Sequence, residues 1–172
     1  LGEPAFPRTV VLGGLRAGLI TAFVVHIVAA AQLTRMNRRA RPVRYQSKRD
    51  YVVANYASRT MRWTGVIVGL FVIFHLFDLT WGAANPHFVR GDPYDNLFAS
   101  FDRVPVAIVY IVANMALGLH IFHGAWSMFQ SLGLNNPRYN QWRRWFAYAF
   151  AGVITVGNVS MPLLITTGLV TR

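Results

Sequence analysis

Four long apolar stretches alternate with polar connections along the 172 residues of this chain. Each stretch has about the 20 residues that a helix needs to cross some 30 Å of hydrocarbon. The pattern predicts an all-α fold, an integral membrane helical bundle with four transmembrane helices that forms a single domain over residues 1–172. The four predicted helices cover residues 10–34, 62–81, 104–131 and 145–169.

Composition and charge support this prediction. Apolar residues make up 54% of the chain and charged residues 13%, against about 25% charged in an average soluble domain. The net charge of +11 is concentrated in two connections, between the first and second stretches and between the third and fourth. The positive-inside rule therefore predicts a multi-pass protein of the cell inner (plasma) membrane with both basic connections in the cytoplasm. There they would meet anionic membrane lipids and a docked soluble subunit, so no nucleic-acid partner is expected.

Histidine is the residue that indicates chemistry. The chain has no cysteine, which excludes a disulfide, a thiolate zinc site and a self-sufficient iron–sulfur cluster in these residues. Ionisable residues at membrane depth usually mark a functional site, and a neutral imidazole is a common ligand of haem iron. The four histidines within the apolar stretches are His26, His75, His120 and His123.

Spacing predicts the depth of three of these histidines. His26 and His120 lie about 13 Å and about 15 Å from the cytoplasmic ends of their helices, so they are level with each other. This arrangement suits axial ligation of one haem from its two faces. His75 lies about 20 Å from the same surface and has no level partner in this chain. Small residues on the same faces leave room for a macrocycle or for close helix packing: Ala22, Ala29, Ala30, Ala113, Ala116, Gly124 and Ser127.

Three further residues have two readings each. His123 follows His120 by three residues and is either a hydrogen-bonding residue at a haem edge or at the membrane interface, which we expect, or a second ligand. Asp78 follows His75 by three residues and is either a proton-handling group at a quinone pocket or an interfacial cap. His87 lies in an outer connection, where its side chain is either solvated or part of a loop that folds over a site in the outer leaflet.

The histidine-bearing segments resemble a known family, the two-haem, five-helix cytochrome b anchors of succinate:quinone oxidoreductases and fumarate reductases. GLHIFHGAWSMFQSLG, from Gly118 to Gly133, is similar to the fourth helix of that family, in which the axial histidine lies thirteen residues before a glycine. In this chain that histidine is His120. YASRTMRWTGVIVGLFVIFHL is similar to the third helix and contains His75, and FVVHIVAAAQLTRMNRRARP is similar to the second and contains His26.

The resemblance implies a membrane anchor and electron-transfer subunit of succinate dehydrogenase. It implies an inner haem b on His26 and His120, and an outer haem on His75 and a histidine of a fifth, upstream helix that is missing here. Arg38, Arg39, Arg59 and Arg62 are placed to pair with haem propionates. The implied partners are the flavoprotein subunit, which oxidises succinate, the iron–sulfur subunit and a membrane quinone, expected to be menaquinone. The whole complex could also form an oligomer.

The quinone site has two predicted positions. Ser58, Arg62, Thr64 and Gly65 form a Ser-x-x-x-Arg-x-Thr-Gly pattern that resembles the quinone motif of single-haem and haem-free anchors, near the cytoplasmic surface. In two-haem members of the family, the quinone generally reacts nearer the outer haem. This favours a quinone site in the neighbourhood of Asp78. The sequence leaves both positions open.

Three other functions remain open at this level. Histidines could share a Rieske-like two-iron two-sulfur cluster with cysteines from the missing segment or another subunit. They could relay protons in a proton-coupled transporter, although the chain has no inverted repeat or broken helices in matching positions. The protein could also be a purely structural anchor without a metal.

Overall fold

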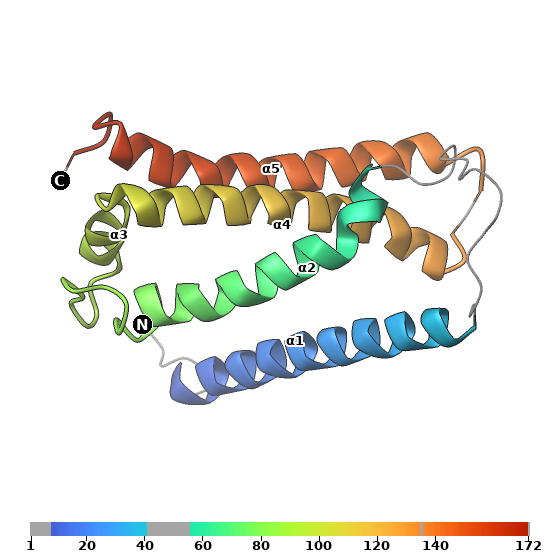
Figure 1. Ribbon diagram of the computed structural model, residues 1–172, viewed down its shortest axis with the longest axis horizontal. Helices are drawn as coiled ribbons and strands as arrows, with labels where there is room; N and C mark the ends of the chain where they lie inside the picture. The colour runs from blue at the N-terminus through green and yellow to red at the C-terminus, as the bar shows by residue number, and fades with distance from the viewer. Residues whose placement is uncertain (1–7, 41–55, 135, 172) are drawn as a thin grey trace, which may run out of the picture. The chain divides into compact units, whose positions relative to one another are not determined.

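The computed structural model describes residues 8–40, 56–134 and 136–171 (Figure 1). The chain divides into two compact units, Leu1–Asp50 and Tyr51–Arg172, and the single domain predicted from the sequence stays a prediction. Four helices in the described ranges are long and apolar enough to cross a membrane: Thr9–Arg39, Thr60–Thr80, Val104–Ser131 and Asn140–Thr166. The predicted all-α membrane bundle is thereby confirmed.

The described residues of the first unit form one long helix, α1, which runs from Arg8 to Arg39. It continues five residues beyond the predicted end at residue 34, because the polar segment that follows the apolar stretch is also compatible with a helix. Arg38 and Arg39 lie in its last turn, where cations interact favourably with the helix dipole. The apolar stretch therefore marks the membrane-spanning part of α1 but not its end.

The part of the second unit that the structure describes contains three helices of membrane length. They are α2 (Tyr56–His75), which continues into the π-helical turn η1 (Leu76–Thr80), α4 (Val104–Ser131) and α5 (Asn140–Thr166). The backbone N–H of Trp81 closes the π-helical turn on the carbonyl of Leu76 at 2.8 Å. Helix α4 packs against both α2 and α5 and forms the centre of the unit (Figure 1).

A short helix, α3 (Pro93–Phe101), interrupts a connection that the sequence pattern left without structure. The side chain of Asp92 accepts a hydrogen bond from the backbone N–H of Asp95 at 3.0 Å, and Pro93 occupies the first turn. Both are established helix-start signals, so the sequence did contain evidence for α3. Helix α3 lies at one end of the unit, beside η1 and the ends of α4 and α5, and we call this the α3 end.

Close contact between α4 and α5 depends on Gly118. This residue is buried, and a Cβ atom added to it would collide with the side chain of Thr155 on α5. Small residues allow helix backbones to approach in membranes, where van der Waals packing contributes much of the association energy. Gly118 therefore sets how closely the two helices approach at this level.

Replacing Gly118 with alanine is expected to destabilise the purified complex by about 1–3 kcal/mol, the usual cost of overpacking. Thermal denaturation in detergent measures the effect. Gly152→Ala is the matched control, because an added Cβ there meets nothing within 4 Å. Alanine favours a helix at both positions, so equal melting temperatures for the two variants would contradict the packing role of Gly118.

Candidate functional site

His120 lies against helix α2. Its Nδ1 atom is 3.3 Å from the hydroxyl oxygen of Thr64, a side chain that is itself buried. A Cβ atom added to Gly65 would lie 3.3 Å from Cε1 of His120, so the missing side chain leaves the imidazole room to approach the helix backbone. Two consecutive residues of α2 thus define the position of one edge of the ring.

His75, the last residue of α2, lies in an aromatic environment. Its ring centroid is 6.0 Å from that of Phe71 and 6.1 Å from that of Tyr110 on α4. His75 follows Thr64 by eleven residues, which corresponds to about 16 Å along a helix. The second unit therefore carries imidazoles at two depths, with His75 nearer the α3 end and His120 in the opposite half.

The remaining predicted histidines are described more briefly. His26 lies within α1, in the first unit, and its pairing with His120 stays a prediction. His123 is half-buried on α4, and its backbone carbonyl accepts a hydrogen bond from Ser127 Oγ at 2.5 Å. His87 is exposed, as expected for a solvated side chain. Among the residues that the structure describes, no three histidine or acidic side chains gather where they could hold a metal ion.

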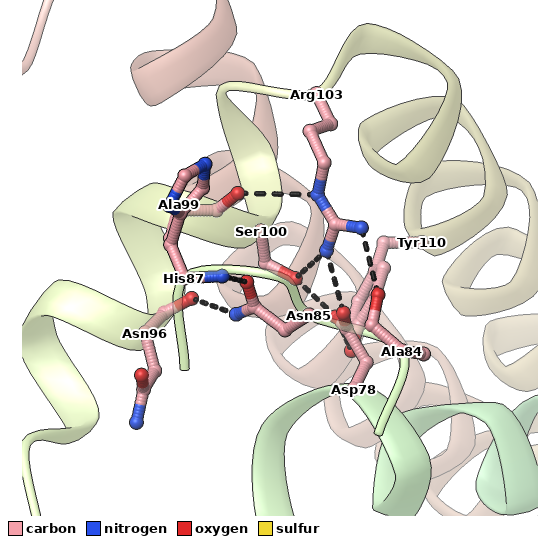
Figure 2. A network of polar contacts seen from close by, with 9 residues as sticks. All are labelled: Asp78, Ala84, Asn85, His87, Asn96, Ala99, Ser100, Arg103 and Tyr110. Atoms are coloured by element: carbon pink, nitrogen blue, oxygen red, sulfur yellow. Dashed lines mark hydrogen bonds and ion pairs between the residues drawn. The ribbon is translucent and has the colours of Figure 1, made fainter. Parts of the chain in front are cut away.

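A buried polar network occupies the α3 end (Figure 2). Asp78, in η1, is fully buried, and its carboxylate accepts hydrogen bonds from Arg103 Nη2 at 2.6 Å, from Tyr110 Oη at 2.9 Å and from Ser100 Oγ. The first of these contacts is also an ion pair. Arg103 further donates to the backbone carbonyl of Ala84 at 2.8 Å. The carboxylate thus joins η1 to α3 and α4, and Arg103 joins it to the segment between η1 and α3.

Two asparagines extend this network into the loop before α3. The side chain of Asn96 donates to the carbonyl of Val89 at 2.8 Å and accepts from the N–H of the same residue at 2.7 Å. Asn85 donates to the carbonyl of Asn96 at 3.2 Å and accepts from the backbone N–H of His87 at 3.2 Å. Because both asparagines are buried, these bonds replace the water that the loop backbone would otherwise need.

The sequence reading missed most of this network. It singled out Asp78 but not Ser100, Arg103 or Tyr110. A tyrosine inside an apolar stretch and an arginine directly before that stretch were the available signals, because polar groups at membrane depth require partners. The geometry gives Asp78 a structural role as the acceptor of three side-chain hydrogen bonds, and both predicted roles, a group at a quinone pocket or an interfacial cap, stay predictions.

The two predicted quinone positions lie far apart. Arg62 is exposed near the start of α2, whereas Asp78 is buried sixteen residues later, about 24 Å along a helix. These residues therefore cannot line one pocket. The side chains of Ser58 and Arg59 lie outside the described part of the chain.

This chain is a polytopic α-helical membrane protein. Its class follows from the length and apolar composition of its helices and from the packing of α2 and α5 against α4. Its sequence matches the model of the Succinate dehydrogenase/Fumarate reductase transmembrane subunit family over residues 34–159, and the chain belongs to that family. The matched region contains His75, His120 and His123, and His26 precedes it. No curated protein and no solved structure matches the chain.

Family membership confirms the resemblance found in the sequence. The protein is a membrane subunit of a succinate dehydrogenase or fumarate reductase complex, and it associates with other subunits of that complex. It is therefore part of an enzyme, with the role of a membrane anchor.

Proposed function

We propose that this chain transfers electrons between the iron–sulfur subunit of the complex and a membrane quinone, through haem b bound to its histidines. The observation that carries the proposal is the placement of His120, whose ring is held between α2 and α4 by Thr64 and Gly65. An imidazole that is oriented by its neighbours at membrane depth is suited to bind a metal centre. Family membership supports the anchor role over a proton-coupled transporter.

The donor chemistry of the chain fits haem iron. Neutral imidazole nitrogens are common axial ligands, and two of them are sufficient because the porphyrin supplies the other four. In this proposal His26 and His120 hold the inner haem, and His75 holds the outer haem together with a ligand from outside these residues. The haem supplies reversible one-electron chemistry, and the protein orients its ligands in a low-dielectric bundle.

Charged residues at the end opposite α3 support an assignment of which end of the unit faces the cytoplasm. The guanidinium groups of Arg143 and Arg144 lie 5.0 Å and 5.3 Å from the ring centroid of Trp126, and Arg138 is exposed in the same connection. We place this end in the cytoplasm of an inner (plasma) membrane, where it would meet anionic lipids and the iron–sulfur and flavoprotein subunits. Arg59 and Arg62 would pair there with the propionates of the inner haem, with Arg38 and Arg39 as further candidates.

The quinone is proposed to bind at the Ser58–Arg62 end. Asp78 already accepts three hydrogen bonds, which leaves its carboxylate little capacity for a ligand and supports the alternative position. Replacing Arg62 with glutamine should raise the KM for a menaquinone analogue about tenfold, the effect of one lost charge-assisted hydrogen bond. Arg138→Gln is the control, and an unchanged KM in the Arg62 variant would favour the Asp78 end.

The absorption spectrum of the purified complex tests the haem proposal. Reduction should produce sharp α and Soret bands, and extraction into alkaline pyridine should yield the haem b chromophore. A broad visible spectrum with acid-labile sulfide would instead indicate the Rieske-like alternative, and a colourless anchor would indicate a purely structural role. Either of these outcomes contradicts the proposal.

A further inference from the structure

The hydroxyl of Thr64 has three polar neighbours and only one hydrogen atom. Its oxygen lies 3.0 Å from the carbonyl oxygen of Met61, 3.2 Å from that of Thr60 and 3.3 Å from Nδ1 of His120. Carbonyl oxygens can only accept, and a threonine in a helix commonly donates to a carbonyl of the preceding turn. The two shorter contacts therefore take the hydroxyl hydrogen.

The contact with His120 then runs in the opposite direction. A neutral imidazole has one N–H group and one nitrogen lone pair, so it can donate from Nδ1 only in the tautomer that leaves the lone pair on Nε2. Thr64 Oγ1 keeps acceptor capacity after donating to the helix carbonyl. The hydrogen bonds of Thr64 thus select the tautomer of His120 that has its proton on Nδ1 and its lone pair on Nε2.

The space at Gly65 restricts where the ring of His120 can lie. A Cβ atom at Gly65 would lie 3.3 Å from Cε1 and 3.7 Å from Nδ1 of His120. The Nδ1 edge of the ring is therefore close to the α2 backbone, and the same edge faces the Thr64 hydroxyl. Because Nε2 lies on the other side of Cε1, the geometry directs it away from the threonine.

We propose that Thr64 is the positioning residue for His120. It accepts the Nδ1–H hydrogen bond that fixes the tautomer and the ring orientation, and it thereby presents Nε2 as the ligand atom. This inference rests on the proposed haem function. Metal-bound histidines generally donate their second N–H to such a partner, and the partner raises the basicity of the ligand. Thr64 and Gly65 thus have a role distinct from the quinone motif in which the sequence pattern placed them.

The test replaces Thr64 with valine and with serine in the whole complex. Valine keeps the shape of the side chain but has no acceptor, so the affinity for the inner haem should fall about tenfold or more. The haem that remains should have a higher midpoint potential, because a less basic ligand stabilises ferric iron less. Serine retains the hydroxyl, so Thr64→Ser should keep the haem affinity and the midpoint potential of the wild type. Thr155→Val is the control, since the Thr155 hydroxyl donates to the carbonyl of Ala151 at 2.7 Å.

The outcomes separate this inference from the proposed function. If the wild-type complex contains haem and Thr64→Val leaves both its haem affinity and its potential unchanged, the positioning role is refuted. If the wild-type complex contains no haem, the proposed function fails. The hydrogen bond between Thr64 and His120 is then tested by the ¹⁵N NMR spectrum of labelled histidine, which shows which ring nitrogen carries the proton. A proton on Nδ1 of His120 would then support the role of Thr64, and a proton on Nε2 would overturn it.

Discussion

Replacing His120 with alanine is expected to remove one haem from each complex and to abolish the corresponding reduced α band. The reason is that an axial imidazole is the direct protein bond to the iron, and alanine offers no substitute ligand. The same loss is expected for His26→Ala, because both residues are proposed to bind the same haem. Redox titration followed by absorption spectroscopy measures the number of haem components in each variant.

Two further histidine variants serve as controls for this result. His75→Ala should remove a different component and leave the inner haem intact, because His75 lies about 16 Å along the helix from the position of His120. His87→Ala should change no component, since the side chain is exposed in the loop before α3. If the spectra of both the His26 and the His120 variants equal that of the wild type, these residues are not haem ligands.

Replacing Arg103 with glutamine is expected to destabilise the complex by about 3–5 kcal/mol, because it leaves the buried Asp78 carboxylate without its counter-charge. Asp78 is 0% exposed and the Arg103 side chain is 29% exposed, so we expect the lower part of this range. Thermal denaturation of the complex in detergent measures the change. The haem components should keep their spectra in the fraction that remains folded.

A double-mutant cycle identifies the ion pair as the cause. Asp78→Asn combined with Arg103→Gln should cost less than the sum of the two single changes, because the double variant contains no unpaired buried charge. Asp102→Asn and Arg90→Gln are matched controls, since both side chains are exposed at the same end of the unit. Strictly additive losses in the cycle would show that Asp78 and Arg103 are not energetically coupled.

The membrane-spanning part of the fold could be predicted from the sequence because it depends on length and composition. The predicted stretch over residues 104–131 coincides with α4 (Val104–Ser131). The bounds of α5 were less accurate, with a start at Asn140 in place of residue 145. Helices extend into the polar interface, where hydropathy no longer marks them, and the apolar pattern therefore places spans more accurately than helix ends.

The site was only partly predictable, because its key contacts join residues far apart in the chain. Spacing predicted different depths for His75 and His120 from each position within its own helix. The contact between Thr64 and His120, however, depends on how α2 is rotated against α4, and apolar periodicity does not determine that rotation for helices that are apolar on most faces. The partners of Asp78 were missed for the same reason.

The π-helical turn Leu76–Thr80 directly follows His75 and contains Asp78. Such a turn contains one residue more than an α-helical turn, and it commonly appears as a local insertion. The segment after His75 is therefore wound out of phase with the helix before it. As a result, the chain can adjust the direction of the Asp78 carboxylate independently of the imidazole. Gain or loss of one residue here would reorient the Asp78 network while the rest of α2 keeps its register.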